Sequence, residues 1–134
     1  MEKFRVWCKD RGEWESYNTY LKSDGQLIHL DRGRLMPLRK DNHIVQFYTG
    51  LKDNKRTKEY PDGQEIYNGY IVHCISHRDS ANMIVIFEKG EFRMVLCEKY
   101  KTYTEGSGYY AIRCFEKEII GNIHENPELI GGEE

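Results

Sequence analysis

The sequence has little cysteine, little proline and no long apolar run. Its four cysteines, Cys8, Cys74, Cys97 and Cys114, include no CxxC pair, so the usual spacing of a zinc finger or a dense disulfide framework is missing. We therefore expect free thiols that act as small core side chains in a reducing compartment. Only three prolines occur in 134 residues, which leaves most stretches open to strand formation.

Membrane and export segments are also missing. Charges at Glu2, Lys3 and Arg5 leave no room for the apolar region of a signal peptide. No apolar stretch approaches the roughly 20 residues that a membrane-spanning helix needs. We expect a soluble, cytoplasmic protein with no membrane partner.

A strong charge of one sign is absent as well. The net charge is −2 and the pI is about 6.2, which weakens any function that depends on global attraction to phosphate. With 39% hydrophobic and 31% charged residues, the composition is that of a globular chain. Its length predicts a single domain over residues 1–134, with an exposed loop at 54–62 and a frayed tail at 131–134.

Aromatic residues are plentiful, at 13% of the chain, and they lie in short alternating stretches. Turn signals separate these stretches, and no segment shows a sustained helical period. The strand-like stretches are 3–9, 14–21, 27–30, 43–48, 66–75, 83–88, 91–97 and 109–115. Lys89-Gly90 predicts a hairpin between two of them. Residues 35–38 contain Pro37 and read as an edge strand or a loop. Asn126-Pro127 predicts the start of one helical turn. The expected fold is mainly β, a small roll or barrel with at most one or two short helical turns.

Known catalytic and metal-binding patterns are not found. His73 and His77 would lie about 13 Å apart on an extended strand, with Cys74 pointing to the other face, so one metal could not readily collect all three. Ser76 beside His77 does not form a catalytic pair, because neighbouring strand residues point to opposite faces. No nucleophile elbow, Walker loop or GxGxxG is present. We expect no catalytic, cofactor-binding or metal-binding residue, no cofactor, and no enzymatic activity.

Nucleic-acid binding is an alternative, because basic residues cluster locally and tyrosines could stack on bases. The candidate residues are Arg32, Arg34, Arg39, Lys40, Lys55, Arg56, Tyr100, Tyr103 and Tyr109. Acidic neighbours dilute both basic clusters, and tyrosines also fill ordinary β-sheets.

Self-assembly is the third possibility. A small β protein exposes strand edges, and its apolar strands exceed what one thin core needs. Pairing with identical subunits would bury them. The predicted partner is therefore a second copy of the chain.

Three stretches resemble the YopX family of phage and prophage proteins from Gram-positive bacteria. They are KFRVW at 3–7, QFYTGLKD at 46–53 joined across a loop to GQEIYNGYIV at 63–72, and EIIGNIHENPELI at 118–130. Their order and spacing match over nearly the whole chain. Two departures are the inserted loop at 54–62 and Tyr70, where the family more often has an aspartate after the glycine.

The resemblance implies a mainly β fold related to SH3-type barrels, phage origin, a homo-oligomer and no established biochemical activity to transfer. Within the motif, we expect Gly63 to close the inserted loop and Gly69 to permit a sharp bend before residues 70–72. Both glycines would then mark a feature of the fold and not a phosphate-binding loop. The favoured function is a non-enzymatic accessory protein that acts by self-assembly or binding.

Overall fold

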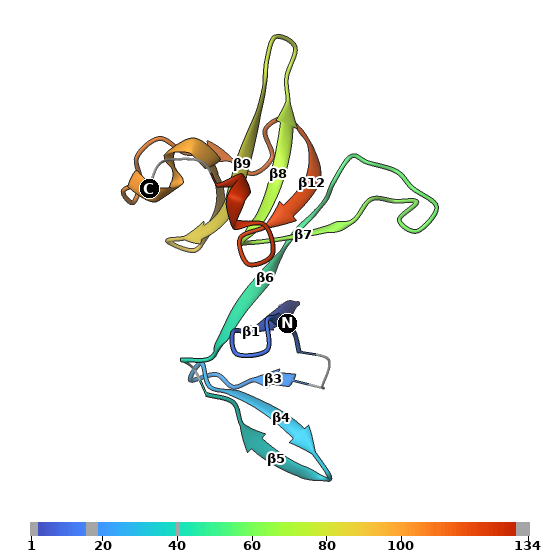
Figure 1. Cartoon of the computed structure of the whole chain (residues 1–134), viewed down its shortest axis with the longest axis vertical. Coiled ribbons are helices and arrows are strands. Elements are labelled where there is room, and N and C mark those ends of the chain that lie inside the picture. The colour runs from blue at the N-terminus through green and yellow to red at the C-terminus, as the bar shows by residue number, and fades with distance from the viewer. Residues whose placement is uncertain (1–2, 16–18, 40, 131–134) are drawn as a thin grey trace. The chain divides into compact units, whose positions relative to one another are not determined.

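The structure is a computed structural model that describes residues 3–15, 19–39 and 41–130. It divides into two compact units, Met1–Phe47 and Tyr48–Glu134, and both are built from β-strands (Figure 1). The mainly β fold is confirmed, while the relation to SH3-type barrels and the single domain stay predictions. The tail predicted at 131–134 lies outside the described residues. No helix formed by the described residues has the length and apolar character to cross a membrane.

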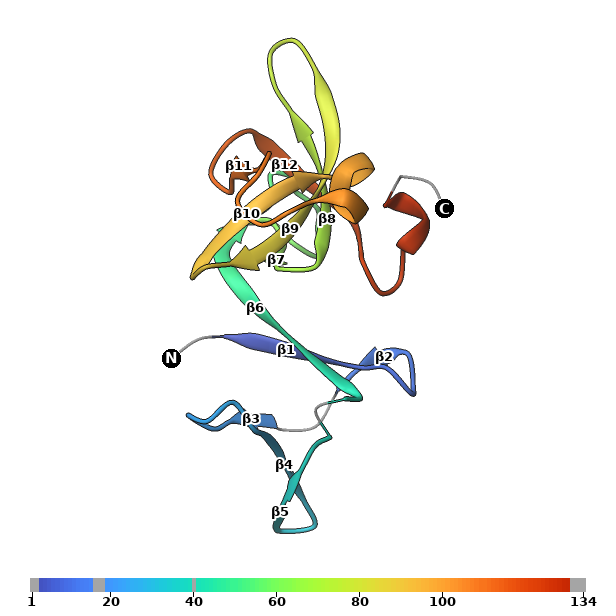
Figure 2. The same ribbon diagram turned by 90° about the vertical axis from the view of Figure 1, so that its left-hand side faces the viewer.

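Unit 1 contains two antiparallel sheets. In the first, β1 (Phe4–Cys8) lies between β2 (Glu13–Trp14) and the first part of β6 (His43–Lys52). The second sheet has the order β3 (Thr19–Leu21), β4 (Leu27–Asp31) and β5 (Arg34–Pro37). Arg32 and Gly33 both have positive φ, 54° and 79°, as a tight two-residue hairpin turn requires. The β4–β5 hairpin extends away from β1 within this unit (Figure 2).

Unit 2 is organised around a five-stranded antiparallel sheet in the order β11-β10-β9-β8-β12. Its strands are β8 (Tyr70–Ile75), β9 (Ser80–Glu88), β10 (Glu91–Leu96), β11 (Tyr110–Ala111) and β12 (Glu116–Asn122). The short β7 (Glu65–Tyr67) pairs with the second half of β6. The fold includes a strongly curled, half-barrel sheet. The predicted hairpin around Lys89-Gly90 is confirmed as β9–β10, with Glu91 opposite Glu88.

The core of unit 2 forms where β8, β9 and β10 contribute alternate apolar side chains to one cluster. Its buried members are Ile71, Ile84, Val95, Cys97 and Ile130. Tyr100, Tyr103, Ile123 and Leu129 pack against it from segments outside the central strands. The 3-10 helices η1 (Cys97–Thr102) and η2 (Pro127–Leu129) therefore close this side of the sheet.

Three predictions of local structure were wrong in part. The stretch 14–21 is not one continuous strand, because β2 ends at Trp14 and β3 begins at Thr19, while residues 16–18 lie outside the described residues. The stretch 109–115 forms only the two-residue β11, and Phe115, with φ of 67°, lies in the turn that follows. The stretch 91–97 ends as a strand at Leu96, and η1 begins at Cys97. The predicted helical turn is confirmed with Pro127 at its first position, although the Asn126 side chain makes no cap hydrogen bond.

The loop at 54–62 is exposed, as predicted, and a buried aspartate closes it. The Asp53 carboxylate accepts hydrogen bonds from the backbone N–H of Gln64 at 2.9 Å and of Ile119 at 3.0 Å. Gly63 has φ of +93°, and a Cβ on it would lie 2.3 Å from the carbonyl oxygen of Asp53. The paired motifs around Asp53 and Gly63 are therefore a structural clamp between the loop and β12.

A second clamp explains the GNIHEN stretch. Gly121 lies so close to Asn126 that an added Cβ would be 2.4 Å from its Oδ1. That oxygen accepts a hydrogen bond from the N–H of Asn122 at 3.1 Å. Gly69, with φ of 92°, forms the bend between β7 and β8, and its carbonyl oxygen accepts from the N–H of Ile123 at 2.8 Å. The bend predicted at Gly69 is confirmed.

Candidate functional site

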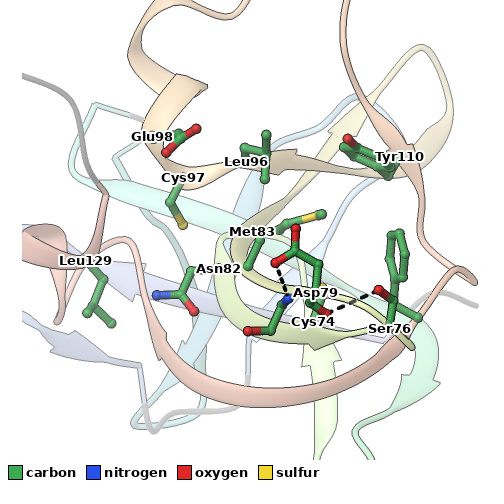
Figure 3. A pocket seen from close by; sticks show the side chains of 13 residues that line it. Cys74, Ser76, Asp79, Asn82, Met83, Leu96, Cys97, Glu98, Tyr110 and Leu129 are labelled. Atoms are coloured by element: carbon green, nitrogen blue, oxygen red, sulfur yellow. Dashed lines mark hydrogen bonds between the residues drawn. The ribbon is translucent and has the colours of Figure 1, made fainter.

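One pocket in unit 2, of about 590 Å³, lies beside the core (Figure 3). Its walls come from β8 and β9, the turn between them, the junction of β10 with η1, β11 with the turn after it, and η2. The lining residues that carry polar chemistry are Cys74, Ser76, Asp79, Ser80, Asn82, Cys97, Glu98 and Tyr110. The lining residues that the structure describes include no histidine.

The two buried thiols of the pocket are held in their neutral form. Burial raises the pKa of Cys74 from 9.0 to about 11, and nearby Lys117 opposes the rise. Burial also raises the pKa of Cys97 to about 11, with a smaller contribution from neighbouring Cys74. Because the thiolate is the nucleophile and the metal ligand, these cysteines behave as core side chains. The structure thus agrees with the predicted core role of three cysteines, since Cys8, Cys74 and Cys97 are buried, but Cys114 is exposed.

The hydroxyl and carboxyl groups of the pocket serve the β8–β9 turn. The Ser76 hydroxyl donates to the carbonyl oxygen of Asp79 at 3.2 Å, and the Asp79 carboxylate accepts from the N–H of Ser80 at 2.9 Å. These bonds stay within the turn, and none links a nucleophile to a base. His73, weighed in the sequence as a metal ligand, contacts Asn82 through its Nδ1 at 2.8 Å, and His77 is exposed in the turn.

The tyrosines proposed for nucleic-acid binding are engaged within unit 2. Tyr100 and Tyr103 pack against the core, and the Tyr103 hydroxyl donates to Glu88 at 2.5 Å. The Arg93 guanidinium lies over the ring of Tyr109, 4.1 Å from its centroid. The ring face that would stack on a base is therefore covered at Tyr109 on one side.

The basic candidates are divided between the two units. Arg32, Arg34 and Arg39 lie in unit 1, where Arg39 is paired with Asp41 at 2.9 Å. Lys55 and Arg56 lie in the 54–62 loop of unit 2, and Arg56 donates to the carbonyl oxygen of Asp53 at 2.7 Å. Lys40 lies outside the described residues. Nucleic-acid binding stays a prediction.

An uncharged apolar face covers one side of the β3–β5 sheet. Strand register places Tyr20 opposite Ile28, Leu30 opposite Leu35, and Pro37 opposite Ile28. Because side chains alternate along a strand, these five residues share one face. Leu35 is 61% exposed, Tyr20 47% and Leu30 42%. We call this surface, formed by Tyr20, Ile28, Leu30, Leu35 and Pro37, the hairpin face.

A buried group of potential metal ligands lies elsewhere in unit 1. Cys8, Glu15 and His43 each offer one ligand atom, and these atoms all lie within 4.8 Å of one another. Cys8 and His43 are directly opposite each other in the β1–β6 pair. Glu15 follows β2, and its backbone N–H donates to the carbonyl oxygen of Val6 at 2.8 Å. Sequence spacing alone does not reveal this group, because only the pairing of β1 with β2 and β6 assembles it.

Comparison with known proteins extends over nearly the whole chain. The sequence matches the model of the YopX family, described as YopX protein, over residues 3–131. The chain is similar to the crystal structure of protein YopX from Bacillus subtilis, with a TM-score of 0.59 and 24% identity over 94% of this chain and 95% of that chain. This likeness shows a shared fold. The comparison with curated proteins found no match.

Proposed function

The chain belongs to the YopX family, and we propose that it acts as a non-enzymatic accessory protein that assembles with copies of itself. A phage or prophage origin and a location in the cytoplasm of the bacterial host belong to the same proposal. The observation that carries it is the hairpin face of unit 1.

The hairpin face has the composition of an interface. Leu30 and Leu35 lie opposite each other and are both exposed, although neither side chain gains from contact with water. Among the strand residues whose side chains the structure describes, no charged one shares this face. Contiguous exposed apolar residues of this kind mark interaction sites in proteins that otherwise bury such surface.

A second copy of the chain is the partner that this face fits. An uncharged face can meet its own copy about a two-fold axis without placing like charges together. The net charge of −2 adds little repulsion between copies.

Packing through the faces is favoured over pairing through the edge of β5. The N–H of Leu38 donates to Leu27 in β4, so by alternation the backbone of Leu35 and Pro37 faces the open edge. Proline has no N–H to offer there, which removes one hydrogen bond from any strand added at this edge. We therefore expect the copies to meet face to face.

The catalytic alternative has no comparable support. The pocket of unit 2 holds two neutral thiols and a turn whose polar groups bond to each other. Such a pocket supplies apolar surface and hydrogen-bond donors, but no activated nucleophile.

Sedimentation velocity over a range of protein concentrations tests the proposal. We expect wild-type protein to associate, and Leu35→Glu to weaken association about 100-fold or more, because an interface would have to bury an unpaired carboxylate. The monomer should stay folded, since Leu35 is exposed next to a hairpin turn.

The matched control is Ile120→Glu, which places the same charge at an exposed apolar position of β12 in unit 2. It should associate like wild type. A wild-type protein that stays monomeric at all concentrations would overturn the proposal, and so would equal effects of the two variants.

A further inference from the structure

We propose that Cys8, Glu15 and His43 form a binding site for a thiophilic divalent metal ion, with Zn²⁺ as its representative. The inference is independent of self-assembly, because it rests on a buried cluster and not on the hairpin face. Thiolate sulfur, imidazole nitrogen and carboxylate oxygen are the three ligand types that zinc takes in proteins.

The strand register of unit 1 directs the three side chains to one face. Cys8 pairs with His43 across β1 and β6, so their Cβ atoms are neighbours. Glu15 lies opposite Val6 through its backbone hydrogen bond, and Val6 shares a face with Cys8. The three ligand atoms lie within 4.8 Å of each other, so small rotamer adjustments would bring them to one ion.

The hydrogen bonds of His43 leave its second nitrogen for a cation. Nδ1 lies 2.8 Å from the carbonyl oxygen of Arg39, which can only accept, so Nδ1 carries a proton. Nε2 lies 3.0 Å from Oε2 of Glu15. Because both Nε2 of His43 and Oε2 of Glu15 have lone pairs, a proton or a metal ion must lie between them. A backbone carbonyl that fixes Nδ1–H and leaves Nε2 for the ion is the arrangement common at metal-binding histidines.

Glu15 has an oxygen whose hydrogen-bonding needs are unmet. Its side chain is 3% exposed, and Oε1 has no hydrogen-bond partner among the described residues. A buried carboxylate oxygen without a partner is costly, and coordination of an ion would satisfy it. This orphaned oxygen is the observation that an ordinary ion pair between Glu15 and His43 does not explain.

The sulfur of Cys8 accepts a hydrogen bond from a neighbouring amide group. The side-chain Nδ2 of Asn42 lies 3.6 Å from Sγ of Cys8 as its hydrogen-bond donor. With a thiolate at Cys8 and a carboxylate at Glu15, a divalent ion would make the set of ligands neutral overall. A site without net charge is favourable here, because Cys8 is only 2% exposed and a net charge would be costly to bury.

Arg11 is the competing cation. Its guanidinium donates to Oε2 of Glu15 at 2.5 Å and is also bonded to Glu13 at 2.7 Å. The Arg11 side chain is 43% exposed, so it can leave Glu15 and stay solvated while it keeps its contact with Glu13. Metal binding at this site therefore exchanges one cation for another.

The site is enclosed, and this decides its role. The side chains of Glu15 and His43 are 3% and 7% exposed, so a substrate could not readily reach a fourth position on the ion. The metal would link β1, β2 and β6 and stabilise unit 1. With three protein ligands, a water molecule would complete the tetrahedral set of four, and the enclosed surroundings distinguish the site from a catalytic centre, which keeps that position open to a substrate.

Titration of the metal-free, reduced full-length chain with Zn²⁺ against a chromophoric chelator tests the site. We expect one ion per chain with a Kd below about 1 μM. Co²⁺ serves as the spectroscopic probe, and a thiolate-to-cobalt charge-transfer band is expected only if Cys8 is a ligand. Both tryptophans, Trp7 and Trp14, lie in unit 1 next to Cys8 and Glu15, so Co²⁺ should also quench their fluorescence.

Ligand variants locate the ion. Cys8→Ser and Glu15→Gln should each weaken Zn²⁺ binding by more than about 100-fold, because even outer-shell changes cost roughly 10–100-fold. Cys97→Ser, at a buried thiol of unit 2, is the matched control and should bind like wild type. Binding that persists unchanged in both ligand variants, or wild-type binding weaker than about 100 μM, would overturn the proposal.

Arg11→Met separates a metal site from a structural ion pair. If Arg11 competes with the ion, its removal should tighten Zn²⁺ binding by about tenfold, although it removes the ion pairs with Glu13 and Glu15 from the metal-free protein. This variant changes an exposed side chain and needs no buried substitution. Unchanged or weaker binding in Arg11→Met would contradict the exchange of cations.

Discussion

The two units of the chain differ in how completely they bury their apolar side chains. Among the described residues, the largest fully buried side chains all belong to unit 2, and they are Ile66, Ile71, Val72, Ile84, Val85, Met94 and Val95. Unit 1 buries Val6, Trp7 and Leu27, but leaves the hairpin face exposed. Unit 2 therefore has the stronger core of its own, although it also exposes Phe87 and Ile120. In unit 1 the residues of the hairpin face lie together on one side of one sheet, where a partner could cover them.

The two units also differ in how some of their buried polar side chains are hydrogen-bonded. In unit 2, Asp53 and Asn122 each bond to two backbone N–H groups. In unit 1, Oε1 of Glu15 and Oε1 of Gln46 have no hydrogen-bond partner among the described residues. Asp53 and Asn122 therefore hold segments of unit 2 together, whereas the carboxylate of Glu15 in unit 1 has an oxygen that a further ligand could use.

The largest expected effect in unit 2 comes from Gly63→Ala. The new Cβ would meet the carbonyl oxygen of Asp53 at 2.3 Å, at a φ of +93°. Because the blocking atom is backbone and the conformation is strained, we expect a loss of about 4 kcal/mol or more in the free energy of unfolding. Amide hydrogen exchange in β8 and β9 measures it locally.

Gly90→Ala is the control for Gly63→Ala, because it has the backbone strain of a positive φ without a close contact to the new Cβ. Gly90 also has a positive φ, +76°, but nothing lies within 4 Å of its added Cβ. Its cost should be only about 1–2 kcal/mol, the cost of the left-handed conformation. Equal losses in the two variants would mean that the clamp at Asp53 does not contribute.

Asp53→Ala should have the next largest effect. It leaves the backbone N–H groups of Gln64 and Ile119 without their acceptor, at about 1–2 kcal/mol each, because both hydrogen bonds are only partly buried. We expect a loss of about 2–4 kcal/mol in urea unfolding. Asp62→Ala, in the exposed loop, controls for the lost charge and should change stability by less than about 0.5 kcal/mol. Similar values for both would show that the clamp is weak.

Much of unit 2 could be predicted from local signals. The β9–β10 hairpin follows from alternation around Lys89-Gly90, whose φ values are both positive. The bend at Gly69 and the turn at Pro127 follow from residues that set φ directly. A few adjacent residues determine each of these features, so each can be predicted from a short stretch of sequence.

The remaining features depend on pairing that no local pattern records. Residues 109–115 have a strand-like composition, but β11 pairs with β10 only at Ala111 and Tyr110 before the chain turns. His43 is 28 residues from Glu15, and their contact exists because β1 lies between β2 and β6. The hairpin face likewise becomes visible only when register shows that its five residues point the same way.

The smallest expected effect concerns the thiols of unit 2 at alkaline pH. The pKa of Cys97 in the fold is raised by burial from 9.0 to about 11. Its contribution to stability is therefore fully present below pH 9 and is lost as the pH rises through about 11. Cys97→Ala removes this contribution, so its stability deficit relative to wild type should shrink by about 1–2 kcal/mol between pH 9 and 11.

Urea unfolding of both proteins under reducing conditions at several pH values from 7 to 11 measures this deficit. Lys117 is buried and its pKa is lowered, which acts in the opposite direction, but Lys117 is present in both proteins and its contribution largely cancels in the difference. Cys114→Ala, at the exposed cysteine, should follow the wild-type pH dependence. A deficit for Cys97→Ala that stays constant up to pH 11 would show that this thiol is not held neutral by the core. The contrast between a self-sufficient unit 2 and an incompletely satisfied unit 1 would then lose one of its supports, because a hydrated thiol implies a looser core in unit 2.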